Sequence, residues 1–188
     1  MKVERHGQAV ILSQKDIELL FTEGLTNDRD RALFGMCLYT GCRINEACSM
    51  LRVDAFNLDR VRSPILIRKG NTKGKHATRS IAPHGELVRL LIAYNSSEGD
   101  YLFPGRWNRG HLHPTSADKI LRVACEKIGL SGVSTHSFRR TVLTSLSNAG
   151  VPLRVIQCIS GHENLGTLQR YLEVSEEQVK SAIAALQF

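Results

Sequence analysis

The chain has 188 residues, which is long enough for one domain with a substantial hydrophobic core. Its formal net charge of +7 favours a polyanionic partner, and a membrane surface is the weaker choice because the sequence shows no long apolar run, signal peptide or lipidation motif. The five cysteines are odd in number and form no CxxC pair, so we interpret them as reduced, mostly buried thiols of a cytosolic protein.

The N-terminal part predicts a short lead-in and two helices. Residues 1–11 show no clear periodicity and are expected to be a leader or linker. Ser13 opens a capping-box pattern, which predicts the start of the first helix. The second helix is expected to begin at Asn27 or Asp28 as its cap and to stop at Gly41.

A third helix is expected directly afterwards, with Arg43 at its N-terminus and Glu46 in its first turn. Backbone N–H groups at a helix N-terminus favour an anion, so Arg43 is a candidate phosphate ligand with Glu46 as its support. The plainer interpretation is an exposed ion pair three residues apart. These two residues alone favour the plainer interpretation, and the motifs farther along the chain shift the balance to phosphate binding.

Residues 63–83 predict a hairpin of a small antiparallel sheet. Two runs rich in β-branched residues, SPILIRKG and ATRSIAP, flank the basic turn NTKGKH. Basic side chains cluster on the hairpin and are expected to touch the phosphates of a polyanionic partner, namely Arg68, Lys69, Lys73, Lys75 and Arg79.

The middle of the chain predicts two core helices joined by a loop. The run from Glu86 to Tyr94 is strongly apolar, and residues 115–130 form an amphipathic pattern. The loop between them carries Arg106 and Arg109 beside a tryptophan, as expected of a contact with the backbone of a polyanion. Its HxH pair lacks a third ligand at metal spacing, so no metal site is expected there.

The most informative stretch runs from residue 135 to 171. His136 and Arg139 share one face at the start of a predicted helix, while apolar residues recur four apart on another face. His162 and Tyr171 follow at a fixed remove. A set of histidines, arginine and tyrosine suits the attack of a tyrosine hydroxyl on a phosphodiester without a metal.

The motifs TGCRINEACSML, HSFRR, SGH and TLQRY, in this order, resemble the signature of the tyrosine recombinases, the phage integrase family of DNA strand-exchange enzymes. Ser160 stands where leucine is more common in that family. The resemblance implies a mainly helical α+β catalytic domain over residues 12–174, with a small antiparallel sheet beside a basic cleft. A C-terminal helix is expected over residues 175–188, which would either cover the core of its own chain or, as the resemblance implies, pack on a neighbouring protomer.

The resemblance implies a role for each matching residue. Arg43 and Arg139 would hold the non-bridging oxygens of the scissile phosphate, and His162 would add a hydrogen bond. His136 would assist proton movement at Tyr171, which would form a 3′-phosphotyrosyl link. Lys73 would protonate the departing 5′ oxygen, with Lys75 as the alternative.

The resemblance further implies partners and conditions. Arg140 joins the residues expected to contact DNA. Double-stranded DNA would be the partner of a homotetramer on paired sites, built from monomers, in a cytoplasm of bacterial or phage origin. No cofactor, metal or ATP is implied. Most relatives also carry a helical DNA-binding domain ahead of this one, which this sequence does not contain.

Two other functions stay open. The first is a site-tolerant topoisomerase of type IB chemistry, which uses a similar residue set. The second is a noncatalytic DNA-binding module of the same fold. The target sequence, and the choice among integration, excision and inversion, depend on base contacts that these motifs do not contain.

Overall fold

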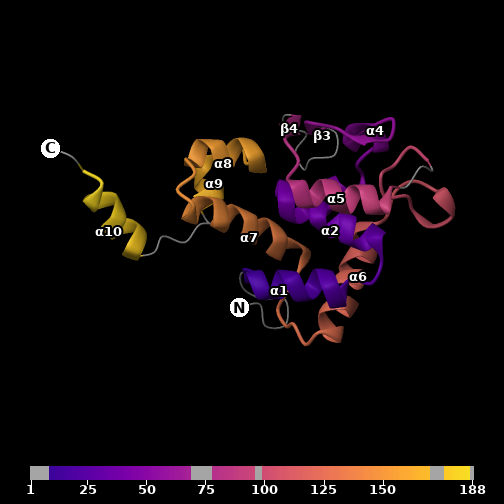
Figure 1. The fold of residues 1–188 in the computed structure, drawn as a ribbon, viewed down its shortest axis with the longest axis horizontal. Coiled ribbons are helices and arrows are strands. Elements are labelled where there is room, and N and C mark those ends of the chain that lie inside the picture. The colour runs from indigo at the N-terminus through magenta and orange to yellow at the C-terminus, as the bar shows by residue number, and fades with distance from the viewer. Residues whose placement is uncertain (1–8, 69–77, 96–98, 170–175, 187–188) are drawn as a thin grey trace.

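The computed structural model describes residues 9–68, 78–95, 99–169 and 176–186 as a mainly helical structure (Figure 1). Its first half contains α1 (Gln14–Leu19), the π-helical turn η1 (Leu20–Gly24), α2 (Asp28–Thr40), α3 (Ile44–Cys48), α4 (Arg52–Ala55) and the strands β1 (Phe56–Asn57), β2 (Arg60–Val61), β3 (Ile65–Ile67) and β4 (Arg79–Ile81). Its second half contains α5 (Gly85–Tyr94), the 3-10 turn η3 (Arg106–Asn108), α6 (Pro114–Lys127), α7 (Thr135–Asn148), α8 (Leu153–Ser160), α9 (Leu165–Gln169) and α10 (Glu176–Ala184).

The predicted ends of the first helices are confirmed. The Ser13 side chain accepts a hydrogen bond from the backbone N–H of Asp16, whose carboxylate accepts one from the N–H of Ser13. Asn27 caps α2 by accepting from the N–H of Asp30, and Gly41 ends that helix with φ 63°, a left-handed conformation that suits glycine.

Helix α2 is the centre of the core. It packs against α5 on one side and α7 on another, and its residues from Ala32 to Leu38 are all buried. Phe34 stacks on Phe138 of α7 with ring centroids 5.3 Å apart. A Cβ on Gly35 would lie 2.6 Å from Leu90 Cδ1, so this glycine allows α5 to approach closely. The packing therefore fixes α7 against α2, and with it the residues at the start of α7.

The strands form two short antiparallel ribbons. The predicted pairing within residues 63–83 is confirmed, because β3 pairs with β4 with Ile67 opposite Arg79. The turn between these strands lies outside the described residues. The β1–β2 ribbon was not predicted, because its turn passes through Leu58 at φ 53°, a conformation that leucine rarely adopts.

The segment ahead of α1 is packed on α7. The Leu12 backbone N–H donates to Thr141 Oγ1 at 2.8 Å, and Arg140 donates to the carbonyl oxygen of Ala9 at 2.7 Å. The Leu12 side chain is buried. The packed chain therefore begins by Ala9, inside the segment 1–11 that the sequence suggested as a leader or linker.

A smaller apolar cluster joins α7, α8 and α9 through Leu143, Ile156 and Leu168. Four of the five cysteines are buried and Cys158 is exposed, largely as the sequence suggested. No helix in the described part of the chain is long and apolar enough to cross a membrane.

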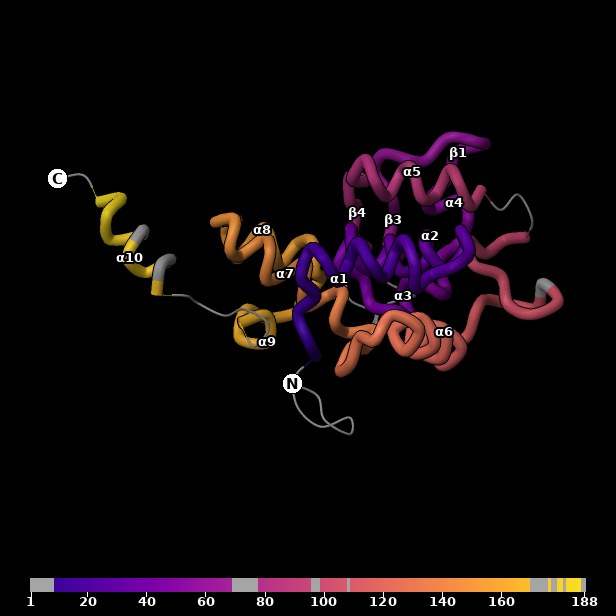
Figure 2. Tube along the Cα trace, turned by 60° about the horizontal axis from the view of Figure 1, so that its bottom comes forward, coloured from indigo at the N-terminus to yellow at the C-terminus, as the bar shows by residue number. Residues whose placement is uncertain are grey.

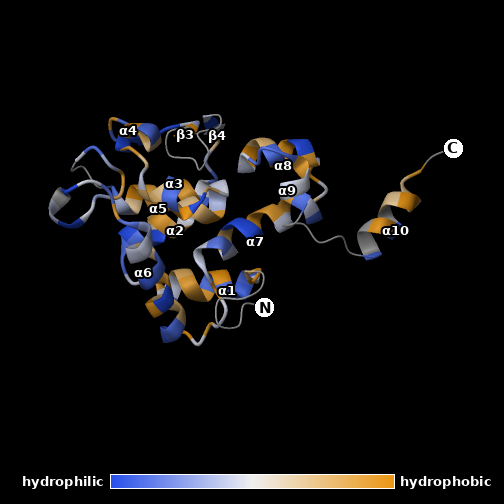
Figure 3. Cartoon of the chain, turned by 180° about the vertical axis from the view of Figure 1, so that it is seen from behind, coloured by the Kyte–Doolittle hydropathy of each residue, from blue (hydrophilic) through white to orange (hydrophobic). Residues whose placement is uncertain are grey.

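Helix α10 stands apart from the rest of the molecule in two views (Figures 1 and 2). Its apolar side chains Val179 and Ile183 are exposed, as is Leu186 just beyond it. Figure 3 shows that this helix, which lies away from the main body, carries hydrophobic residues. The packing of this helix on another protomer stays a prediction.

Candidate active site

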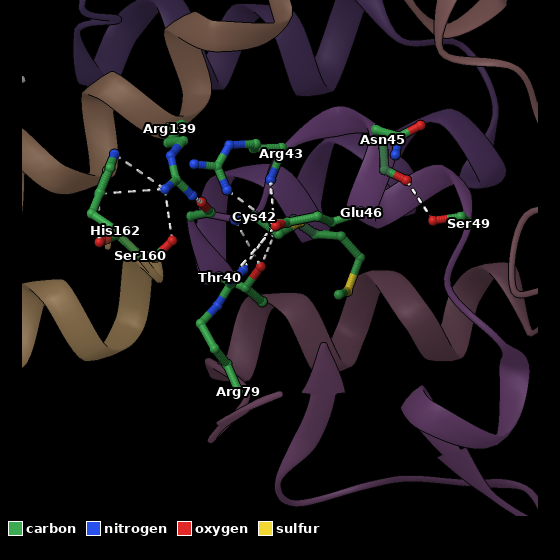
Figure 4. A network of polar contacts seen from close by, with 12 residues as sticks. Thr40, Cys42, Arg43, Asn45, Glu46, Ser49, Arg79, Arg139, Ser160 and His162 are labelled. Carbon is green, nitrogen blue, oxygen red and sulfur yellow. Dashed lines mark hydrogen bonds and ion pairs between the residues drawn. The ribbon is translucent and has the colours of Figure 1, made fainter. Parts of the chain in front are cut away.

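Arg139 lies at the centre of a polar network where α3, α7 and the end of α8 meet (Figure 4). Its side chain is only 1% exposed. One terminal nitrogen donates to the carbonyl oxygen of Gly41, and the other donates to that of Ser160 at 2.6 Å. Two carbonyls from distant parts of the chain thus set the orientation of this guanidinium plane.

Arg43 is the N-cap residue of α3, as the sequence predicted. Its backbone N–H donates to Glu46 Oε2 at 2.8 Å, and its Nη1 donates to Glu46 Oε1 at 3.2 Å. The Arg43–Glu46 ion pair that the plainer interpretation predicted is therefore present. It is not an exposed pair, since the Glu46 side chain is 1% exposed and the Arg43 side chain is 27% exposed. Arg43 keeps one side toward solvent while a buried carboxylate orients it.

Arg79 on β4 reaches the same carboxylate. Its Nη2 lies 2.8 Å from Glu46 Oε2 and its Nη1 lies 3.4 Å from Oε1. Burial alone would raise the pKa of Glu46, but the hydrogen bond and charge of Arg79, with the backbone N–H of Arg43, outweigh burial and lower it. Glu46 is consequently ionised and links two arginines from separate elements.

His162 is buried beside Arg139. Its Nδ1 lies 2.8 Å from Ser160 Oγ, and both ring nitrogens lie 3.4 Å from Arg139 Nη2. Burial, followed by the charges of Arg139, Arg43 and Arg79, lowers the pKa of His162 to about 3. The imidazole is therefore neutral at physiological pH and carries a single N–H to donate.

A cleft of about 460 Å³ opens beside this network, between β4 and α8. Arg79, Arg154, Gln157, Gly161 and His162 are among its lining residues. The histidine can therefore be approached from a hollow in the surface although its own side chain is 5% exposed.

His136 lies in the first turn of α7, three residues before Arg139, and its side chain is exposed. The turn is held by the backbone N–H of Ser134, which donates to Ser137 Oγ at 3.1 Å. The structure thus assembles Arg43, Glu46, Arg139 and His162 around one point and places His136 on the helix that carries Arg139.

Several predicted residues lie outside the described part of the chain, namely Lys69, Lys73, Lys75 and Tyr171. The elements next to them are described. Strands β3 and β4 flank the turn that carries the lysines, and α9 ends at Gln169, two residues before Tyr171. Leu168 of α9 is buried against the apolar cluster on α7 and α8.

The residues expected to contact DNA differ in their surroundings. Arg106 and Arg109 are exposed on the loop before α6, as the sequence suggested. Arg68 is half exposed and its Nε donates to both carboxylate oxygens of Asp54, each at 2.8 Å.

Arg79 and Arg140 are placed differently from the expected surface contacts. Arg79 is 7% exposed and pairs with Glu46, while Arg140 is 8% exposed and donates to the carbonyl oxygen of Ala9. Both side chains thus meet acceptors within the protein that are distant in sequence, and the phosphate contacts predicted for these two residues stay predictions.

Sequence reasoning missed three contributors to this network, which are the carbonyls of Gly41 and Ser160 and the Ser160 hydroxyl. Backbone oxygens carry no signal in a sequence. Ser160 did stand out as a departure at a motif position, and its hydroxyl bonds the neighbouring histidine, as a leucine could not. Gln157 adds a hydrogen bond from its side chain to the carbonyl oxygen of His162 at 3.0 Å.

No cluster of three or more His, Cys, Asp or Glu side chains suited to a metal ion occurs among the residues that the structure describes. Of the predicted HxH pair, His111 Nδ1 lies 2.9 Å from the carbonyl oxygen of Leu112 and its ring packs on Tyr101, while His113 accepts from the N–H of Thr115 as the N-cap of α6. Each histidine therefore has a structural partner.

Comparison with known proteins places these motifs in one family. The sequence profile of the phage integrase family matches residues 11–178. A tyrosine recombinase of Pseudothermotoga lettingae is 30% identical over 180 residues, which cover 93% of this chain and 60% of that protein. The tyrosine recombinase XerC of Halalkalibacterium halodurans is 32% identical, covering 81% of this chain and 52% of the relative. The chain thus spans between half and three fifths of the length of these relatives.

Solved structures share the fold. The XerA recombinase superposes with a TM-score of 0.78 at 24% identity, covering 97% of this chain and 68% of that one. XerH bound to its palindromic difH substrate superposes with a TM-score of 0.73 at 21% identity, covering 96% and 54% of the two chains. These likenesses bear on the fold alone, and they agree with the mainly helical α+β class predicted from the sequence.

Proposed function

Because the chain belongs to the phage integrase family, we propose that it is a tyrosine-type site-specific recombinase, which cleaves and rejoins DNA strands through a covalent 3′-phosphotyrosyl intermediate. The observation that carries the proposal is the meeting of Arg43, Arg139 and His162 around one point, although they are far apart in sequence. These are the residues for which the family motifs imply phosphate binding.

The two arginines would stabilise the charge that builds on the phosphate. Planar guanidinium forks match the geometry of non-bridging phosphate oxygens, and a preorganised donor contributes most where charge develops in the transition state. Arg139 is held by two carbonyls and Arg43 by a buried carboxylate. Little reorganisation would therefore be needed when the phosphate enters.

His162 would donate a hydrogen bond without bringing a charge. Its lowered pKa keeps the ring neutral, and the bond between Nδ1 and Ser160 Oγ sets the orientation of that ring. His136, exposed on the first turn of α7, would assist transfer of the proton from the Tyr171 hydroxyl, whose usual pKa near 10 makes it a poor nucleophile unaided.

The covalent step would exchange one phosphodiester oxygen for another. Oη of Tyr171 forms a bond to phosphorus as the bond from phosphorus to the 5′ oxygen breaks, and Lys73, or Lys75 as the alternative, gives its proton to that oxygen. A second 5′ hydroxyl reverses the attack and joins a new strand. Because the phosphotyrosyl link conserves the phosphodiester, the balance of the reaction requires neither ATP nor an oxidant.

Double-stranded DNA is the proposed partner. The net charge of +7 and the exposed Arg106 and Arg109 suit a phosphate backbone, and the XerH relative was solved on a DNA substrate. We further propose a homotetramer on two DNA sites, with α10 and Leu186 packing on the neighbouring protomer. Deleting residues 175–188 should reduce the assembly on DNA to smaller species in analytical ultracentrifugation, and unchanged assembly would reject that role.

The chemistry can be tested on supercoiled plasmid in EDTA, quenched with SDS and scored for protein attached to DNA. The wild-type chain and Tyr101→Phe should give adducts, whereas Tyr171→Phe should bind DNA and give none. Tyr101 is a suitable control because it packs on His111, away from the network. Wild-type binding without any adduct would favour the noncatalytic module, and relaxation with no need for paired sites would favour the topoisomerase.

A further inference from the structure

We propose that Arg79 is a positioning residue for strand cleavage, holding Arg43 and the Gly161–His162 turn in the geometry that the phosphate requires. The inference rests on the proposed function and adds a residue to it. Arg79 touches neither the phosphate nor the nucleophile in this scheme. It acts through the groups that do.

The first connection runs through Glu46. Arg79 meets this buried carboxylate with both terminal nitrogens, at 2.8 and 3.4 Å. Glu46 in turn accepts from the backbone N–H of Arg43 at 2.8 Å and from its Nη1 at 3.2 Å. Strand β4 and the start of α3, 33 residues apart in sequence, are therefore joined by one carboxylate (Figure 4).

Sharing this carboxylate has an electrostatic consequence for Arg43. With Arg79 present, Glu46 already has a strong cationic partner, and Arg43 keeps one side exposed to solvent. Without Arg79, the buried charge of Glu46 would have Arg43 as its nearest cation. The Glu46 carboxylate would draw the Arg43 guanidinium inward and offset its positive charge, and this ion pair would compete with phosphate binding.

The second connection runs through Gly161. A Cβ on this residue would clash with Arg79 Nη1, and it would lie 2.8 Å from Arg79 Cδ and 3.0 Å from Arg79 Cζ. The Arg79 side chain therefore lies directly against the backbone that leads into His162. Gly161 is required twice, for this contact and for its left-handed φ of 66°.

The hairpin explains why Arg79 points inward. Ile67 and Arg79 face each other across the ribbon and are both buried, while the next residue on β4, Ser80, is exposed. Alternation along a strand thus sends Arg79 to the side of the network. Lysine would not replace it, because one ammonium cannot meet two carboxylate oxygens and cover a backbone turn as a planar fork does.

A direct phosphate contact by Arg79, the expectation from the sequence, makes opposite predictions. If Arg79 contacts a phosphate, its removal would weaken DNA binding and lower the salt dependence of the affinity by about one unit of slope. If Arg79 is a positioning residue, its removal lowers the rate of cleavage of bound DNA and leaves the affinity and its salt dependence unchanged.

The test measures the single-turnover rate of adduct formation on saturating supercoiled plasmid in EDTA, together with affinity for a random-sequence duplex at several salt concentrations. Arg79→Met should slow the adduct step by about 100-fold with the affinity within twofold. Arg79→Lys should recover little of the rate. Arg89→Met is the control, since it removes another arginine–carboxylate pair, with Glu86 on α5, and its rate on bound DNA should match the wild type.

Coupling to Glu46 completes the test. If Arg79 acts through Glu46, the double variant Arg79→Met/Glu46→Gln should be no slower than the slower single variant. If the rate loss of the double variant equalled the product of the two single losses, the inference would be overturned. A wild-type rate in Arg79→Met, or a reduced salt dependence of its DNA affinity, would also overturn it.

Hydrogen exchange gives a readout that does not need activity. Arg79→Met should speed exchange at the amides of Arg43 and Gly161 while the amides of α5 keep their wild-type rates. Unchanged exchange at both sites would overturn the inference. A wild-type chain that forms no adduct would count against the proposed function, and the exchange result would still decide the role of Arg79.

Discussion

Acidification should destabilise this protein through His162. The pKa of this histidine is about 3 in the folded state because the side chain is buried beside arginines, whereas an exposed histidine in the unfolded chain has a pKa near 6.5. Between these values the unfolded state binds more protons, so the free energy of unfolding falls as the pH falls. The full contribution of the neutral ring is present above about pH 6.5 and disappears toward pH 3.

The loss of stability at pH 5 hardly depends on the exact pKa of His162 in the folded state. At that pH the unfolded histidine is almost fully protonated and the folded one almost fully neutral, which corresponds to about 2 kcal/mol relative to pH 7.5. The other acid-sensitive group in the network, Glu46, has a pKa lowered from 4.5. Its contribution is present above about pH 4.5 and is lost only below that, outside this window.

Urea unfolding followed by circular dichroism at pH 5, 6, 7.5 and 8 measures this contribution. The stability of the wild type should fall by about 2 kcal/mol more than that of His162→Gln between pH 7.5 and pH 5. Only the change with pH is compared, so a lower absolute stability of His162→Gln does not matter. Equal pH dependence in the wild type and His162→Gln would refute the assignment of a neutral, buried ring.

Three further substitutions test the packing and the turns. Asn27→Ala should lower the free energy of unfolding by about 1 kcal/mol in urea denaturation, because α2 loses its N-cap; no loss would show that the cap is redundant. Gly35→Ala should cost about 1–3 kcal/mol by forcing Leu90 away from α2, and a thermal scan showing no loss would contradict the close approach of α5. Gly161→Ala should slow adduct formation more than it weakens DNA binding, because its Cβ would displace Arg79; a normal rate would contradict that contact.

Local features of this protein followed from the sequence because they depend on neighbouring residues. The caps at Ser13 and Asn27 and the stop at Gly41 use side chains or conformations within three residues of the helix end. The β3–β4 ribbon was also predictable, from its runs of β-branched residues. The β1–β2 ribbon was not predictable, because its turn uses Leu58 at positive φ, and leucine is not a turn signal.

The sequence by itself indicated the candidate catalytic residues, since ordered motifs pointed to Arg43, Arg139 and His162 without any coordinates. Only the tertiary structure decided their surroundings. The carbonyl of Gly41 lies 98 residues from Arg139, and Glu46 lies 33 residues from Arg79. Such pairs form because the packing of the helices brings distant backbone together and excludes water. The same packing pairs Arg79 with the buried Glu46 and lowers the pKa of His162, which keeps its ring neutral.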